Sequence, residues 1–145
     1  MKLKLKITLI LTGNVSSFCF KLHKNNNKCD LMSKTSAGKE GELLAINYLK
    51  SKGYDILRTN YRAGRNEIDI IARMDSFVVF VEVKYRSTIK YGYPEEMVSG
   101  DQEERIREAA ELYLETENWK GNIRFDIIAI HKKKECAIFH IRDAF

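Results

Sequence analysis

The chain has 145 residues, of which 31% are charged and 44% belong to the hydrophobic class. This length favours a single domain, and the composition is typical of a globular protein rather than a disordered one. The formal net charge of +5 is unevenly spread, because residues 1–34 hold seven lysines and one acid. The remaining 18 basic and 19 acidic residues give a net charge of −1, so the basic excess alone does not indicate a nucleic-acid-binding domain.

Residues 1–33 differ in pattern from the rest of the chain. Their lysine-rich start leads into an apolar run that breaks at Gly13-Asn14, well short of the roughly 20 apolar residues that cross a bilayer. No small-residue cleavage site follows, so a secretory signal is not indicated. We expect residues 1–33 to be a disordered leader, or the product of a start codon assigned too early, and residues 34–145 to form the domain.

The pattern from residue 34 onward predicts the element order α-β-β-β-α-β-β. The first helix is expected over 36–52, with Ser36 at its N-cap and Gly53 ending it. The second helix is expected over 98–116. Five strands are expected, at 54–60, 66–72, 77–84, 123–130 and 136–141. Together these elements predict one α/β domain with a central mixed sheet flanked by helices.

Charged residues interrupt the two strands expected on either side of the Asp75-Ser76 turn. Asp69 lies in the first apolar run, and Glu82 and Lys84 lie in the second. Such side chains are rarely buried unless they are paired or bind a metal. If the two strands pair through that turn, Asp69 and Glu82 come to one place with Lys84 beside them.

Two carboxylates at one place suit Mg²⁺ or Mn²⁺, which prefer hard oxygen ligands. The ligands expected are Asp69, Glu82 and the peptide carbonyl of Val83, and Glu42 on the sheet-facing stripe of the first helix would complete the acid cluster. A divalent metal activates water and neutralises charge on phosphate, and Lys84 would position the water or stabilise the transition state. The alternative is a structural ion pair of Lys84 with Asp69 or Glu82.

Basic residues gather around this candidate site. Seven lie between Arg58 and Lys90 against four acids, whereas nine acids and two arginines lie between Glu95 and Glu117. A basic band beside an acidic helix would orient a polyanion. The nucleic-acid-binding residues expected are Arg62, Arg65, Arg86 and Lys90. The alternative is two solvated surfaces of opposite sign.

Other side chains with chemical potential indicate structural roles. The three cysteines (Cys19, Cys29 and Cys136) form no CxxC pair, and the three histidines lack metal-ligand spacing, so zinc is not indicated. This cysteine usage fits a reducing cytoplasm. Arg124 and Asp126, two apart in a later strand, are expected to form a structural pair.

Ordered motifs extend over residues 38–145. They are Gly38-x-x-Gly41-Glu42, Ala45-x-x-Tyr48-Leu49, Gly53-Tyr54, Asn60-x-Arg62, Glu67-Ile68-Asp69-Ile70-Ile71-Ala72, Phe80-Val81-Glu82-Val83-Lys84-x-Arg86, Arg124-Phe125-Asp126 and Asp143-Ala144-Phe145. In these motifs the chain resembles the YraN-like family of bacterial proteins, which is similar to archaeal Holliday-junction resolvases and belongs to the PD-(D/E)xK nuclease superfamily. The resemblance implies a restriction-endonuclease-like fold. It also implies that Glu42, Asp69, Glu82 and Lys84 match the superfamily's metal and catalytic positions.

Two positions depart from the pattern of that family. Asn66 stands where relatives usually have glycine, and asparagine tolerates a positive φ better than most residues. Gln102 stands where relatives usually have lysine, at the start of the second long helix. If that lysine contacts phosphate, this protein lacks one such contact.

The sequence therefore supports two hypotheses about function. The first is a Mg²⁺- or Mn²⁺-dependent endonuclease that hydrolyses DNA, such as branched or otherwise structured DNA, in the cytoplasm and without a membrane partner. The second is a catalytically inactive nucleic-acid-binding or adaptor module that retains the nuclease fold. A homodimer is expected only by analogy, because resolvase-like relatives act as dimers on symmetric junctions.

Overall fold

The computed structural model describes residues 18–22, 34–86, 98–132 and 136–145. Within these segments the chain forms two helices and one six-stranded sheet. In chain order the elements are β1 (Phe18–Leu22), α1 (Lys34–Ser51), β2 (Asp55–Ala63), β3 (Asn66–Met74), β4 (Phe77–Arg86), α2 (Gly100–Thr116), β5 (Asn122–Lys132) and β6 (Cys136–Ile141). Neither of these two helices combines the length and the apolar character that a membrane span requires.

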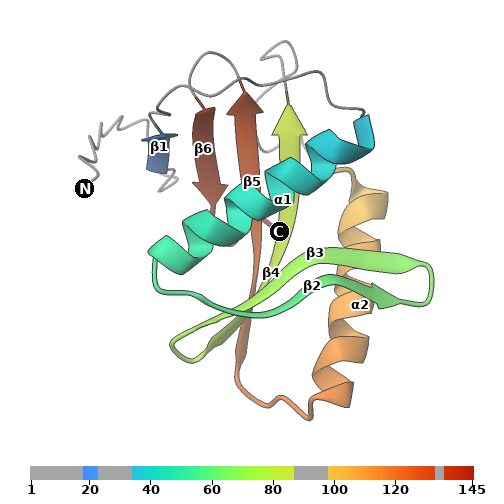
Figure 1. Cartoon of the computed structure of the whole chain (residues 1–145). Helices are drawn as coiled ribbons and strands as arrows, with labels where there is room; N and C mark the ends of the chain where they lie inside the picture. The colour runs from blue at the N-terminus through green and yellow to red at the C-terminus, as the bar shows by residue number, and fades with distance from the viewer. Residues whose placement is uncertain (1–17, 23–33, 87–97, 133–135) are drawn as a thin grey trace.

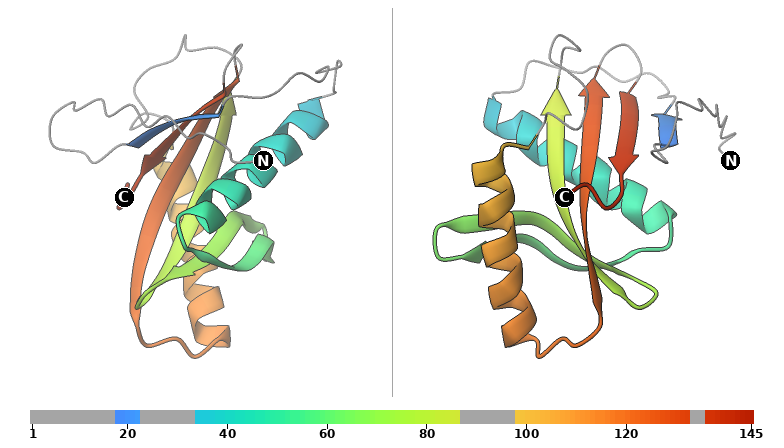
Figure 2. Two further views of the ribbon diagram at one scale, coloured as in Figure 1. Left: turned by 60° about the vertical axis from the view of Figure 1, so that its left-hand side comes forward. Right: turned by 180° about the vertical axis from the view of Figure 1, so that it is seen from behind.

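The sheet is mixed, with the strand order β1-β6-β5-β4-β3-β2. Strands β4 and β5 pair in parallel, and every other neighbouring pair is antiparallel. A parallel pair needs a crossover connection, which contains α2. Helix α1 crosses one face of the sheet and α2 lies against the other (Figure 1; Figure 2). This architecture confirms the predicted α/β class and is consistent with a restriction-endonuclease-like fold.

Strand β1 was not anticipated from the sequence. Phe18–Leu22 pairs antiparallel with β6 along its whole length. The expectation of a disordered leader over residues 1–33 is therefore wrong for this segment, and the rest of the leader lies outside the described residues. The available signal was the alternation of Phe18, Phe20 and Leu22, which is typical of a strand.

Helix α1 is terminated by Gly53, as predicted. Gly53 has a φ of +86°, and its N–H donates to the carbonyl of Lys50 at 3.0 Å. The N–H of Tyr54 donates to the carbonyl of Leu49 at 3.1 Å. These two bonds form a Schellman motif, whose left-handed residue is usually glycine. At the other end, Ser36 lies inside the helix rather than at the predicted N-cap.

Each face of the sheet carries its own apolar core, and β4 contributes to both. Val79 and Val81 pack with α1, whereas Val78 and Phe80 pack with α2. All four side chains are at most 1% exposed. By the same alternation, Glu82 and Lys84 further along β4 belong to the α2 face. The strand that carries the candidate glutamate and lysine is therefore held firmly from both sides.

The β2–β3 hairpin separates from the rest of the sheet part of the way along β3. Pairing between β3 and β4 ends at Ile70 opposite Val81, whereas β4 stays paired with β5 as far as Arg86. The hairpin itself remains paired to its tip, and it runs across the other strands at a steep angle (Figure 1). Asp69 is the first residue of β3 beyond the last pair with β4.

Asp126 on β5 is a fully buried acid whose charge is compensated. Its carboxylate accepts two hydrogen bonds from Arg124, both at 2.8 Å, and one from the N–H of Asp143 at 3.0 Å. The Nε2 of His140 on β6 lies 2.8 Å from the carboxylate, and it carries the proton because a carboxylate only accepts. Burial raises the pKa of Asp126, but the bonds from His140 and Arg124 outweigh it and hold the pKa below its usual range. The predicted structural pair of Arg124 and Asp126 is confirmed within β5, and the contact of Asp126 with His140 links β5 to β6.

We predict that Asp126→Asn destabilises the fold by about 3–5 kcal/mol, because it leaves the charge of Arg124 without its buried partner. Urea unfolding at neutral pH measures the change. Asp55→Asn is the matched control: it removes a carboxylate that pairs with Arg73 at 3.2 Å on the surface and should cost at most about 1 kcal/mol. Equal effects of the two variants would contradict the structural role of Asp126.

Candidate active site

Asp69 is fixed at the point where β3 leaves β4. Its Oδ2 accepts a hydrogen bond from the backbone N–H of Val83 at 2.7 Å. In an uninterrupted ladder a strand carbonyl would accept from that N–H, so the side chain replaces a backbone partner. The other oxygen, Oδ1, accepts no hydrogen bond within the described parts of the chain. Asp69 is thus held to β4 through Oδ2, and its Oδ1 could serve as a ligand.

The surroundings of Asp69 oppose its negative charge. Burial raises the pKa of Asp69 to about 7, and the charges of Glu82 and Glu42 contribute in the same direction. The N–H of Val83 and the ammonium of Lys84 act against this shift without cancelling it. Acids whose negative charge is disfavoured in this way are frequent at functional sites, because a bound cation or a proton transfer offsets the unfavourable electrostatic energy. This electrostatic environment separates Asp69 from the well-compensated Asp126.

Glu82 and Lys84 form a close ion pair on the α2 face of β4. Lys84 Nζ lies 2.8 Å from Glu82 Oε1, and the two side chains are 14% and 10% exposed. Gln102, in the first turn of α2, contacts both. Its Nε2 donates to Glu82 Oε1 at 2.6 Å, and its Oε1 accepts from Lys84 Nζ at 2.8 Å. The structural pairing considered for Lys84 is therefore present, with Glu82 as the partner.

Glu42 approaches the site from α1. Its Oε2 accepts a hydrogen bond from Asn60 Nδ2 of β2 at 2.7 Å. Burial raises the pKa of Glu42, the charge of Glu67 adds to this, and Lys39 lowers it. Glu42 therefore acts on Asp69 through its charge, while its hydrogen bond links α1 to the hairpin. The charge of Glu42 thus reaches Asp69, and a role for Glu42 in an acid cluster stays a prediction.

The donor set at the site fits a hard divalent cation. Asp69 and Glu82 each retain one carboxylate oxygen that accepts no hydrogen bond from the described residues. The N–H and C=O of one strand residue point to the same side, so the Val83 carbonyl points toward Asp69. Among the residues that the structure describes, no three acidic, histidine or cysteine side chains gather around one ion position. Two carboxylates, a carbonyl and water are nevertheless a usual set for Mg²⁺.

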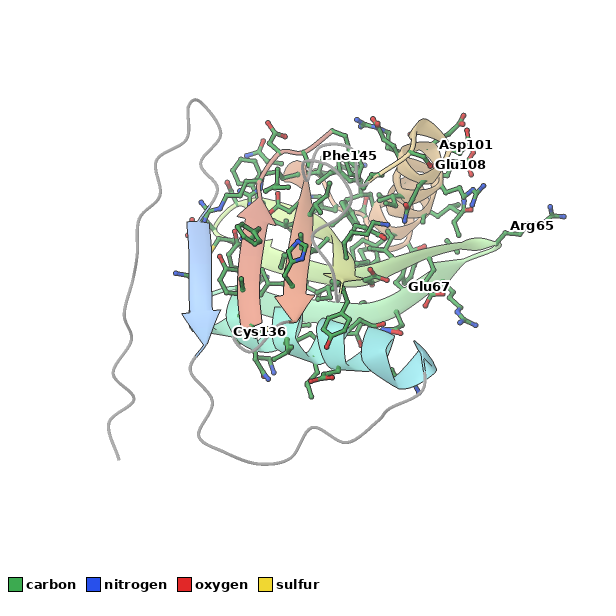
Figure 3. The ribbon with its side chains drawn as sticks, turned by 90° about the horizontal axis from the view of Figure 1, so that it is seen from above. Arg65, Glu67, Asp101, Glu108, Cys136 and Phe145 are labelled. Atoms are coloured by element: carbon green, nitrogen blue, oxygen red, sulfur yellow. The ribbon has the colours of Figure 1, made fainter. Side chains whose placement is uncertain are left out.

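The structure describes the side chains of two of the four predicted nucleic-acid-binding residues, Arg62 and Arg65. Arg62 pairs with Glu67 at 3.3 Å on the hairpin. Arg65 occupies the hairpin tip, and Figure 3 shows its side chain projecting away from the rest of the molecule. The side chain of Arg86 and all of Lys90 lie outside the described residues. A DNA-binding role for these residues stays a prediction.

Two polar residues that contact the acids were not predicted as part of the site. In the sequence, Gln102 stands out only for its residue type, and Asn60 only as part of a motif. Asn60 has a φ of +51° inside β2, close to a register shift between Ile56 and Arg58. A strand residue in the left-handed region is unusual, and Asn is one of the few types that tolerate it. An asparagine inside an otherwise regular strand was the only signal available.

The pairing of the strands and the helices on both faces of the sheet define the protein as an α/β domain, and this architecture is consistent with a restriction-endonuclease-like fold. The profile of "Uncharacterised protein family UPF0102" matches residues 41–130. A UPF0102 protein of Thermodesulfovibrio yellowstonii is 44% identical over 114 residues, covering 79% of this chain and 99% of that protein. One from Clostridioides difficile is 45% identical over 115 residues, covering 79% and 100%. One from Syntrophus aciditrophicus is 47% identical over 110 residues, covering 74% and 87%. The chain belongs to the UPF0102 family, the YraN-like group.

We predict that Asp69→Asn stabilises the metal-free protein at pH 8 but not at pH 4.5. The pKa of Asp69 rises from 3.8 to about 7 on folding, so its favourable contribution is complete below pH 3.8 and is lost as the pH rises through 7. The neutral amide should avoid this loss and keep an oxygen to accept from Val83. Screening by solvent limits the expected gain at pH 8 to about 1–3 kcal/mol.

Urea unfolding of the variant and the parent protein, with a chelator at both pH values, measures this difference. Asp55→Asn serves again as the control, because Asp55 lies on the exposed edge strand and far from the acids of the site in the fold. If the free energies of unfolding of Asp69→Asn and the parent protein differ by the same amount at pH 4.5 and pH 8, folding does not raise the pKa of Asp69.

Proposed function

We propose that the protein is a divalent-metal-dependent endonuclease that hydrolyses phosphodiester bonds in DNA, with branched or structured DNA as the substrate class and the cytoplasm as its location. One observation carries this proposal. Asp69 and Glu82 converge beside Lys84 where β3 leaves β4, and Asp69 is held there against an unfavourable electrostatic environment. Membership of the YraN-like group, which is related to nucleases, supports the fold more strongly than the activity.

Each residue of the site would have its own role in hydrolysis. Asp69, Glu82 and the Val83 carbonyl would hold Mg²⁺ or Mn²⁺, which supplies charge neutralisation and activation of water at the phosphate. Lys84 would donate a hydrogen bond to the attacking water or to a phosphate oxygen, where an ammonium stabilises developing negative charge. Glu42 would support the acid cluster through its charge. Arg65 at the hairpin tip would contact the DNA backbone.

The direct test is cleavage of duplex, single-stranded and four-way DNA by the purified protein with Mg²⁺ or Mn²⁺. We expect Asp69→Asn and Lys84→Met each to lower the cleavage rate by about 100-fold or more, because each removes a group that stabilises the transition state. Asp55→Asn should cleave like the parent protein. Circular dichroism confirms that each variant is folded. Cleavage that persists in both site variants would come from another source and would refute the assigned roles.

A second function is favoured by the pairing of the arginines near the site. Among the described residues, the ion pairs on and around the hairpin include Arg58–Glu117, Arg62–Glu67 and Arg73–Asp55. Because these charges are already matched within the chain, they offer less attraction to a polyanion, and Lys84 is likewise paired. Weaker attraction for a polyanion favours the adaptor form of a non-catalytic module that has kept the nuclease fold.

Calorimetric titration with Mg²⁺ separates the two functions. The endonuclease should bind the ion with release of protons at pH 7, because Asp69, with a pKa of about 7, is partly protonated before the cation arrives. Asp69→Asn should abolish both the binding and the proton release. A non-catalytic module should show no Mg²⁺ binding, and a gel-shift assay with DNA then separates a nucleic-acid-binding module from an adaptor that binds another partner.

A further inference from the structure

The side chain of Gln102 does not take the role that its local sequence predicts. Ser99 precedes Gln102 by three residues at the start of α2, which is the spacing of a capping box. Half of that motif is present, since Ser99 Oγ accepts from the N–H of Gln102 at 3.3 Å. The carboxamide, which would complete the motif by turning back to the N-cap, extends instead to β4 and contacts Glu82 and Lys84.

The three side chains form a closed ring of contacts. Gln102 Nε2 donates to Glu82 Oε1, Lys84 Nζ donates to Gln102 Oε1, and Lys84 Nζ lies beside the same Glu82 Oε1, with all three distances between 2.6 and 2.8 Å. Only one orientation of the amide satisfies the ring. In the flipped orientation the NH₂ group would face the ammonium and the amide oxygen would face the carboxylate.

The chemistry of the ring requires a neutral side chain that both donates and accepts. Glutamate at position 102 would repel Glu82, and lysine there would compete with Lys84 for the carboxylate. An amide bridges the anion and the cation without altering the charge of the site. Both donors of the ring use Oε1 of Glu82, so Oε2 accepts no hydrogen bond from the residues that the structure describes.

We propose that Gln102 is a positioning residue, which fixes the orientation of the Glu82 carboxylate and the Lys84 ammonium and joins the first turn of α2 to the site. The effect on the reaction rests on the proposed nuclease function, whereas the effect on Lys84 does not. Groups that orient metal ligands in this way commonly change affinity or activity by about 10–100-fold when they are replaced.

The first arm of the test measures Lys84 in metal-free buffer, by pulse labelling with a dilute amine-reactive anhydride and mass spectrometry. In the parent protein, Lys84 should react more slowly than Lys50, which is exposed on α1. In Gln102→Leu, which keeps the approximate size but cannot form hydrogen bonds, Lys84 should react about 5–10-fold faster, because one charge-assisted bond is lost. Lys50 is the internal reference, and Glu104→Gln, an exposed change on the same helix, is the matched control.

The second arm measures Mn²⁺ affinity by calorimetry and DNA cleavage under saturating and limiting substrate. We expect Gln102→Leu to weaken Mn²⁺ binding by about 10-fold and to lower kcat while KM for DNA stays unchanged. Gln102→Glu should lower kcat further, because it cannot donate to Glu82. Glu104→Gln should match the parent protein in both measurements.

The two arms keep this inference separate from the proposed function. Lys84 labelling that is equally fast in the parent protein and in Gln102→Leu would overturn the positioning role, whatever the cleavage result. A raised KM with unchanged kcat would also overturn it, since Gln102 would then serve DNA binding. A parent protein that neither binds metal nor cleaves DNA would overturn the proposed function, and the labelling result alone would then decide the role of Gln102.

Discussion

The hydrogen bond from the Val83 N–H to Asp69 is the constraint on which the site depends. A strand that leaves its neighbour exposes backbone donors, and a donor away from water must find another acceptor. Asp69 provides that acceptor at 2.7 Å, at the first position of β3 beyond the last pair with β4. Where the β3–β4 ladder ends, the carboxylate of Asp69 therefore lies against β4, next to Glu82. Moving the divergence by one residue would turn the side chain to the opposite face.

Two acids of the sheet, the buried Asp126 and the half-buried Asp69, differ in how far their charges are compensated. Asp126 receives bonds from Arg124, His140 and the backbone, and its pKa falls despite burial. Asp69 receives one backbone bond and lies near other acids, and its pKa rises. The rigid cores on both faces of β4 hold Asp69 in this position. A fold can retain an unfavourable charge only where the rest of the structure determines the backbone.

The sequence predicted what depends on local patterns. Helical and strand periodicity gave the order of elements from α1 onward, and charges inside apolar strands identified Asp69, Glu82 and Lys84 as neighbours. It missed what depends on contacts far apart in the chain. The Gln102 ring joins residues 18 and 20 positions apart, and the pairing of Arg58 with Glu117 spans 59. Counting basic residues along the chain could not reveal such pairing.

The electrostatics of the site link any nucleic acid bound there to a cation. The charges of Glu42, Glu82 and Lys84 all act on Asp69, and that lysine is already paired with Glu82. Acids therefore outnumber the cations among these side chains, and a phosphate approaching them would be repelled at close range, where water screens poorly. The charge that raises the pKa of Asp69 is the same charge that would exclude a phosphate. Binding of a divalent cation and binding of a phosphate at this place must consequently favour each other, because each offsets the charge that opposes the other.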